Sequence, residues 1–158
     1  MIHIALYSPE IPPNTGNIGR LCVVTGTTLH LIEPLGFSLD EKHLRRAGMD
    51  YWEHVQLRVH PDFSAFLEFV AHVNGTLCAF TKFATQWHTE MPASVEPLFL
   101  LFGRETTGLG ADIRAQCGEH LYRLPMLQQE HCRSLNLSNA VSVALYEVLR
   151  QRGFPNLT

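Results

Sequence analysis

Three segments of the chain combine glycines with polar or charged side chains in patterns that hydrophobic packing alone does not require. They occupy residues 11–20, 100–110 and 133–140. Glycine lets a second backbone approach closely, and the free amides at the start of a helix attract anionic groups. We therefore take these three segments as the candidate ligand-binding loops.

Two common nucleotide-binding motifs do not fit these segments. Residues 11–20 do not match the GxGxxG fingerprint of dinucleotide-binding proteins. Gly103 and Gly108 have the spacing of a P-loop, but Leu109 and Gly110 stand where that motif needs lysine and then serine or threonine. Without the lysine, no side-chain charge meets the β- and γ-phosphates, which argues against a P-loop nucleotidase.

Each segment also has a simpler structural interpretation. Residues 11–20 could form an ordinary asparagine and glycine turn with a solvated Arg20, and residues 100–110 could connect a strand to a helix. Residues 133–140 could cap the helix that follows. A cap needs one polar residue, whereas four polar side chains alternate here with two leucines: Ser134, Asn136, Ser138 and Asn139.

The elements that must position these segments follow from the apolar pattern. Six short apolar runs rich in β-branched residues are typical of strands, and most of them alternate with helical patterns. The runs are residues 2–7, 29–33, 55–59, 77–81, 98–103 and 121–124. We expect an α/β fold with a mainly parallel sheet and helices on both faces, in which ligands bind beyond the carboxyl ends of the strands.

Three helices can be placed from capping residues and apolar periodicity. Asp62 is a plausible N-cap for an apolar face that runs from Phe63 to Val73. A second face, over residues 137–148, should end near Gly153 and Pro155. A third helix is expected near residues 18–25, after a loop of turn residues.

The composition is that of one ordinary globular domain spanning residues 1–158, with 46% hydrophobic residues. The apolar runs are too short to cross a bilayer, and no basic leader precedes the first one. The four cysteines are scattered without a CxxC pair, as in reduced thiols. We expect a cytoplasmic protein with no membrane partner.

Neither metal-binding nor nonspecific nucleic-acid-binding patterns stand out. The nine histidines show no HExxH spacing, and the adjacent side chains of residues 130–132 would point in different directions, so we expect no metal. A net charge of −3 argues against nonspecific coating of nucleic acid, although a specific RNA enzyme with a local basic patch is compatible with it. Lys42, His43, Arg45 and Arg46 form the densest basic cluster, either a solvated helix face or a phosphate track.

Taken together, the three segments resemble the three motifs of SPOUT-class methyltransferases, in the same order and spacing. The matching residues are Asn14, Gly16, Asn17, Gly19 and Arg20, then Phe102, Gly103, Glu105, Gly108 and Leu109, then 134–140. Further matches at residues 5–12, 32–37 and 44–51 make the chain similar to the small tRNA 2′-O-methyltransferases of the TrmL type.

The resemblance implies a fold, a cofactor and a substrate. The fold would be the SPOUT fold, with its C-terminal segment threaded into a trefoil knot, assembled as a homodimer. The cofactor would be S-adenosyl-L-methionine. The substrate would be tRNA, methylated on the 2′-hydroxyl of the wobble nucleotide (position 34, a cytidine or modified uridine) of tRNA(Leu)-type molecules.

The resemblance also assigns roles to individual residues. Cofactor contacts, mainly through the backbone, fall to Phe80, Gly103, Leu124 and Ser134. The catalytic set is Arg20, Asn14, Glu105 and Asn136, in which the last three either hold the loops and orient Arg20 or act directly. Substrate RNA is expected to contact Arg45, Arg46 and Tyr146, and the alternative for Tyr146 is dimer support.

Three other interpretations compete with this one. A related SPOUT enzyme could methylate another tRNA position or rRNA. A knotted RNA-binding module could have lost catalysis, although the presence of Arg20, Glu105, Ser134 and Asn136 argues against this. An unrelated nucleotide-binding α/β protein would bind ATP or NAD instead.

Overall fold

The computed structural model describes residues 1–39, 51–127, 129 and 134–158. Within them, seven strands form one sheet in the order β3-β2-β1-β6-β4-β7-β5, and all neighbouring strands run parallel. The strands are β1 (Ile2–Tyr7), β2 (Thr28–Ile32), β3 (Leu57–His60), β4 (Thr76–Phe80), β5 (Gln86–Trp87), β6 (Leu98–Phe102) and β7 (Leu121–Arg123). The predicted parallel sheet is confirmed.

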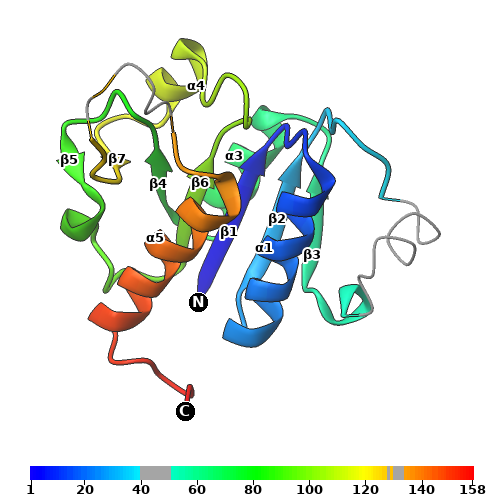
Figure 1. Ribbon diagram of the computed structural model, residues 1–158. Coiled ribbons are helices and arrows are strands. Elements are labelled where there is room, and N and C mark those ends of the chain that lie inside the picture. The colour runs from blue at the N-terminus through cyan, green and yellow to red at the C-terminus, as the bar shows by residue number, and fades with distance from the viewer. Residues whose placement is uncertain (40–50, 128, 130–133) are drawn as a thin grey trace.

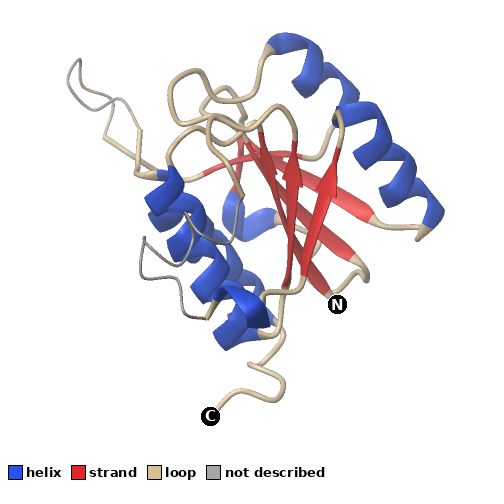
Figure 2. Cartoon of the chain, turned by 90° about the vertical axis from the view of Figure 1, so that its right-hand side faces the viewer, coloured by secondary structure: helices blue, strands red, loops and turns tan. Residues whose placement is uncertain are grey.

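Helices cover both faces of this sheet, as predicted (Figures 1 and 2). The helices are α1 (Pro12–Thr25), α3 (Phe63–His72), α4 (Ala111–Gln116) and α5 (Leu137–Gln151), with short 3-10 turns η1 (Trp52–His54) and η2 (His88–Glu90). One apolar core joins α1 and α5 to the sheet, and a second core joins α3 and α4 to it. Side chains of β1 alternate between them, with Ile4 and Leu6 in the first and Ala5 in the second.

Two of the predicted helices are confirmed in their caps and ends. The Asp62 carboxylate accepts a hydrogen bond from the Ala65 amide at 2.8 Å, so it caps α3 as expected. Helix α5 ends at Gln151, two residues before Gly153.

The prediction for α1 was wrong about where the helix begins. The helix begins at Pro12 rather than near residue 18, so most of the first candidate segment is helical. Proline suits the first helical turn because its missing N–H would have no partner there. Gly19 lies inside the helix because the Trp52 ring packs against it, and a Cβ at Gly19 would come within 2.7 Å of that ring.

The predicted strands needed two smaller corrections. Strand β3 begins at Leu57 instead of residue 55, because Val55 ends the turn of η1. Strand β5 was not predicted, since its two residues are both exposed and carry no apolar periodicity.

The strand order places two loops side by side at the carboxyl edge of the sheet. From β1, the chain builds β2 and β3 on one side, whereas β6 and β4 lie on the other. The connections after β1 and β6 therefore diverge at a topological switch point, which is where open α/β sheets bind ligands. Both candidate segments that follow these strands begin at this point.

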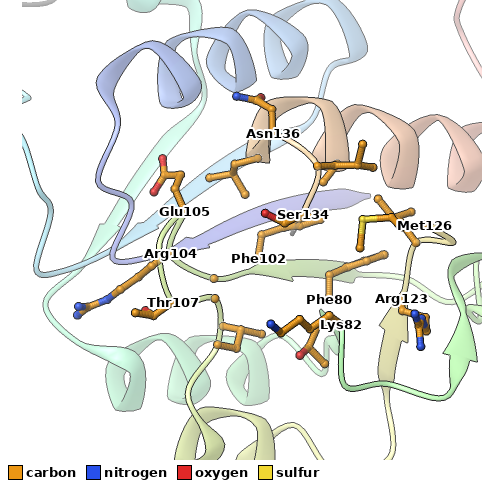
Figure 3. Close-up of a pocket in the computed structure, with 18 of the residues that line it drawn as sticks. Phe80, Lys82, Phe102, Arg104, Glu105, Thr107, Arg123, Met126, Ser134 and Asn136 are labelled. Carbon is orange, nitrogen blue, oxygen red and sulfur yellow. The ribbon is translucent and has the colours of Figure 1, made fainter. Parts of the chain in front are cut away.

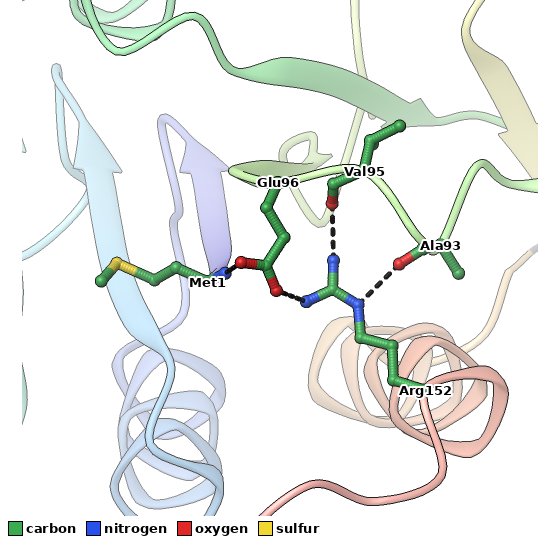
Figure 4. A network of polar contacts seen from close by, with 5 residues as sticks. All are labelled: Met1, Ala93, Val95, Glu96 and Arg152. Atoms are coloured by element: carbon green, nitrogen blue, oxygen red, sulfur yellow. Dashed lines mark hydrogen bonds and ion pairs between the residues drawn. The ribbon is translucent and has the colours of Figure 1, made fainter.

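At the other end of the sheet, a polar network joins the two chain ends (Figure 4). The Met1 amine contacts the Glu96 carboxylate at 2.7 Å, and Arg152 contacts the same carboxylate at 2.7 Å. Arg152 also donates to the backbone carbonyls of Ala93 and Val95. The end of α5 is thereby tied to the residues that precede β6.

Three buried histidines form a hydrogen-bonded row across β1, β2 and β3. Nδ1 of His3 lies 3.0 Å from Nε2 of His30, and Nδ1 of His30 lies 2.9 Å from Nε2 of His60. Burial lowers the pKa of His3 to about 4 and of His30 to about 3, and it also lowers the pKa of His60. The terminal amine and Arg58 add repulsion, so the row is neutral in the folded protein.

We predict that this row makes the protein less stable as the pH falls below about 6.5. The unfolded chain takes up a proton on His3 near pH 6.5, whereas the folded chain does so only near pH 4. Lowering the pH from 7 to 5 should therefore reduce the unfolding free energy by about 2 kcal/mol for one such histidine. Urea unfolding followed across this range measures the slope.

A matched pair of variants isolates the row. Replacing His3, His30 and His60 together by leucine should flatten the dependence between pH 7 and pH 5, and the exposed His72→Leu should leave it unchanged. An unchanged slope in the triple variant would assign the acid sensitivity to other groups.

Candidate functional site

The Glu105 carboxylate connects the loop after β6 to the start of α1. It accepts hydrogen bonds from the backbone amides of Glu10 at 2.8 Å and Ile11 at 3.1 Å. It also accepts one from the Asn14 side-chain amide at 3.2 Å. One charged group thus satisfies two backbone amides at the helix start, where negative charge is favourable.

The same chain of hydrogen bonds continues to the start of α5. The Asn136 side-chain amide donates to Oδ1 of Asn14 at 2.9 Å. Oδ1 of Asn136 caps α5 by accepting from the amides of Ser138 at 2.9 Å and Asn139 at 3.4 Å. The three candidate segments, far apart in the sequence, therefore meet through Glu105, Asn14 and Asn136, all predicted catalytic residues.

The Glu10 carboxylate, just before the first segment, in turn accepts hydrogen bonds from the second segment. Oε2 of Glu10 accepts from the Thr106 amide at 3.1 Å and from the Thr106 hydroxyl at 2.7 Å. These hydrogen bonds lower the pKa of Glu10. No role for Glu10 was predicted from the sequence, although an acidic residue just after a buried strand was a usable signal.

Gly103 allows the second segment to fold back on itself. The backbones of Arg104 and Gly108 exchange two hydrogen bonds, of 3.3 and 2.9 Å. A Cβ at Gly103 would lie only 2.2 Å from the carbonyl carbon of Gly108. No other residue fits at Gly103 unless the loop opens.

A pocket of about 890 Å³ lies among the three segments and the ends of β4 and β7 (Figure 3). All four predicted cofactor residues line it, together with Asn14, Glu105 and Asn136. The four are Phe80, Gly103, Leu124 and Ser134. The rings of Phe80 and Phe102 stack with their centroids 4.6 Å apart, which gives the pocket an aromatic wall.

The residues present fit a cofactor made of a nucleoside and an amino acid. The volume lies within the usual range for small-molecule sites. Phe80, Phe102 and Leu124 supply apolar walls for an adenine, and the glycine-rich turn at Gly103 exposes backbone groups for hydrogen bonds. The Ser134 side chain points into this space in Figure 3.

Arg20, also predicted to be catalytic, is not among the described residues that line the pocket. It is exposed on α1, and its guanidinium lies 4.8 Å from the centre of the Tyr51 ring. The Tyr51 hydroxyl donates to the Gly16 carbonyl at 2.6 Å, which holds the ring against α1. The role of Arg20 stays a prediction.

The predicted RNA-contacting residues are also outside the pocket or outside the described part of the chain. Tyr146 lies on α5 with 46% of its surface exposed and does not line the pocket. Arg45 and Arg46 lie outside the described residues. By contrast Lys82, Arg104 and Arg123 line the pocket. From the sequence, a phosphate contact was an open alternative for Arg104, and no RNA role was predicted for Lys82 or Arg123.

Within the described residues, neither a metal-binding cluster nor a membrane-spanning helix is found. Among them, no group of three or more histidine, cysteine or acidic side chains could hold a metal ion. None of their helices is long and apolar enough to span a bilayer. Residues 130, 131 and 132, the trio considered from sequence, lie outside the described part.

A family model described as the SpoU rRNA Methylase family matches residues 1–146. The chain belongs to this family. The tRNA (cytidine(34)-2'-O)-methyltransferase of Escherichia coli (strain K12) is 50% identical to it over 156 residues, which cover 98% of this chain and 96% of that protein. The predicted family resemblance is confirmed.

Solved structures agree with this membership. One, described as "Structural insights into the 2-OH methylation of C/U34 on tRNA", is 43% identical, covers 97% of both chains and has a TM-score of 0.86. The SpoU methyltransferase AviRb from Streptomyces viridochromogenes, solved with AdoMet, has a TM-score of 0.80 and 24% identity. It covers 95% of this chain and 60% of its own, and supports the fold alone.

We predict that Glu105→Gln loosens the junction between the loops and the helix starts. The glutamine amide would place N–H groups against N–H donors, so the variant should lose about 1–2 kcal/mol of unfolding free energy. It should also bind S-adenosylhomocysteine more weakly, as measured by calorimetric titration. Glu68→Gln, on the exposed side of α3, is the matched control; equal behaviour of the two variants would contradict the prediction.

Proposed function

We propose that the protein transfers a methyl group from S-adenosyl-L-methionine to the 2′-hydroxyl of nucleotide 34 of tRNA. The observation that carries this is the hydrogen-bonded chain through Glu105, Asn14 and Asn136, which gathers the three family segments around one pocket. The names of the relatives that match nearly the whole chain support the tRNA substrate and the position. The tRNA(Leu)-type preference is the part that rests on the resemblance alone.

The pocket residues would hold the cofactor, and the protein's main task is positioning. When bound, S-adenosyl-L-methionine supplies a methyl group activated by its sulfonium. Phe80, Gly103, Leu124 and Ser134 would fix the nucleoside part, largely through backbone groups. Methyl transfer is an in-line displacement, so the ribose oxygen must be held roughly 3 Å from the methyl carbon.

We assign Arg20 to the RNA side of the reaction. A guanidinium stays protonated in proteins, so it is a poor base but a strong anchor for a phosphate or a developing alkoxide. Asn14, Glu105 and Asn136 would then act as positioning residues, since their polar groups are engaged with backbone and with one another. Arg20 does not line the pocket of its own chain, so a second copy of the chain would have to bring an Arg20 to that pocket.

We propose a homodimer in which Arg20 of one copy reaches the pocket of the other. Helices α1 and α5 pack side by side, and both expose apolar side chains: Val24 on α1, and Val143 and Tyr146 on α5. Arg20 lies one turn from Val24 on the same side of α1. Pairing of two copies through these helices would bury the apolar side chains and bring Arg20 of one copy toward the pocket of the other.

Three further features belong to this proposal. The single domain would span residues 1–158, and its C-terminal segment would form the trefoil knot of SPOUT proteins. A tRNA substrate fits a cytoplasmic location. The buried, free thiols of Cys22, Cys78 and Cys117 fit a reducing compartment.

The direct test is methyl transfer from labelled S-adenosyl-L-methionine to total tRNA, followed by nucleoside mapping. We expect label on the ribose of nucleotide 34. Label only at another tRNA position or in rRNA would overturn the assigned substrate, and no transfer with normal cofactor binding would indicate a non-catalytic module.

Arg20→Lys keeps the charge but loses the planar fork of donors. We predict that turnover falls about tenfold or more while affinity for S-adenosylhomocysteine is unchanged. Single-turnover methylation and calorimetry measure the two quantities. Normal turnover in this variant would remove Arg20 from the mechanism.

Mixing subunits tests whether Arg20 acts across the dimer. Arg20→Ala and Asn136→Ala subunits, each weakly active alone, should regain about a quarter of wild-type activity when co-expressed, because half of the dimers would hold one intact site. If the mixture is no more active than its parents, each copy uses its own Arg20.

A further inference from the structure

Two exposed aromatic side chains lie beside the pocket, at the side where β4, β5 and β7 end. Phe83 is 63% exposed and Trp87 is 44% exposed. Covering a large exposed ring with a second flat apolar group lowers the free energy. Their setting indicates which kind of group that is.

The Trp87 ring is held in place by sheet pairing with an arginine beside it. Trp87 of β5 and Arg123 of β7 are register partners on neighbouring parallel strands. The Arg123 guanidinium carbon lies 5.3 Å from the centre of the Trp87 ring. The Trp87 amide also donates to the Glu90 carboxylate, which fixes the backbone at this ring.

Two cationic side chains lie over the Phe83 ring. The guanidinium carbon of Arg114 lies 4.4 Å from the ring centre, and the Lys82 ammonium lies 5.3 Å from it. Arg114 is fixed by donating to the Leu109 carbonyl at 2.5 Å. The Phe83 amide lies in a short turn, 3.3 Å from the Thr81 hydroxyl oxygen that accepts its hydrogen bond.

We define the aromatic rim as Lys82, Phe83, Trp87, Arg114 and Arg123. Three of its members, Lys82, Phe83 and Arg123, also line the pocket. Figure 3 shows Lys82 and Arg123 on the side of the pocket opposite Asn136 and Glu105. These three residues therefore belong to one wall of the site, and the rim combines rings with cations although the whole chain has a net charge of −3.

We propose that the aromatic rim binds the substrate RNA by stacking nucleobases that neighbour the methylated nucleotide on Phe83 and Trp87. Lys82, Arg114 and Arg123 would contact the phosphates between them. Stacking on aromatic rings with flanking cations is how proteins hold unpaired nucleotides, and every nucleobase has a flat face to offer. This inference rests on the proposed function, because it requires that the RNA substrate lies beside the pocket that these residues line.

The nearby acidic groups leave this charge pattern in place. Asp112 on α4 and Glu90 in η2 are the carboxylates closest in sequence to the rim. Glu90 is engaged with the Trp87 backbone amide. Three cations thus lie at the two rings, and their proximity favours a polyanion over an acidic or neutral protein partner.

The test compares variants that remove a ring with variants that keep one. Phe83→Ala and Trp87→Leu should each weaken tRNA binding and raise the KM for tRNA about tenfold, with kcat little changed. Trp87→Tyr keeps a stacking surface and should stay near wild type. Arg123→Gln should weaken binding and reduce its salt dependence, because one phosphate contact is lost.

Matched controls come from the opposite edge of the sheet and from the chain end. Arg58 lies 4.9 Å from the Phe69 ring centre on edge strand β3, so Arg58→Gln removes a similar arginine without touching the rim. Phe154→Leu removes an exposed ring beyond α5. Both should leave the KM for tRNA unchanged, and S-adenosylhomocysteine affinity should be unchanged in these two controls and in Trp87→Leu, since none of the three residues lines the pocket.

The outcomes separate this inference from the proposed function. If the wild-type protein methylates nucleotide 34 but Phe83→Ala and Trp87→Leu bind tRNA normally, the rim inference is overturned and the function stands. An equal loss in Arg58→Gln and Arg123→Gln would reduce the effect to general charge and overturn it too. If the wild type does not methylate nucleotide 34, the proposed function fails, and tRNA affinity still tests the rim.

Discussion

The site depends on one carboxylate that bridges the gap where the strand order reverses. Loops after β1 and β6 diverge there, and the backbone amides of Glu10, Ile11 and Thr106 donate to carboxylates of the facing loop. Glu105 satisfies two of those amides and Asn14 together, and Glu10 returns the same kind of contact to Thr106. Because an unpaired amide is costly once water is displaced, these contacts hold the loops at one separation and keep the pocket open between them.

The start of α5 is tied to the same junction, which links the cofactor pocket to the main core. Asn136 caps the helix with its oxygen and binds Asn14 with its nitrogen, so one amide side chain serves both purposes. Leu137 and Ala140 line the pocket, while Val141 and Leu145 on the same helix pack in the core. A shift of α5 would therefore disturb both, and ligand binding should stabilise the fold by mass action.

Structural features were predicted best where a residue pattern is compatible with few alternative structures. Buried parallel strands appear as continuous apolar runs, and the polar residues of 134–139 exceed what a helix cap requires, whereas the roles of Asn14 and Glu105 came from the family resemblance. The start of α1 was missed because Gly16 and Gly19 suggest a turn, and only the Trp52 ring packed on Gly19 explains a glycine inside a helix. The position of Arg20 depends on which side of α1 faces the pocket, and the row of His3, His30 and His60 depends on the order of the strands. Neither property can be predicted from the local sequence pattern.

The net charge of −3 does not describe the distribution of charge around the pocket, where carboxylates and cations have different partners. Glu10 and Glu105, the carboxylates nearest the switch point, accept hydrogen bonds from backbone amides. Lys82, Arg114 and Arg123 instead contact aromatic rings, which leave the cations free to attract phosphates. If RNA binds as proposed, an acidic chain would present it with a locally basic wall, because these three cations lie together over aromatic rings beside the pocket.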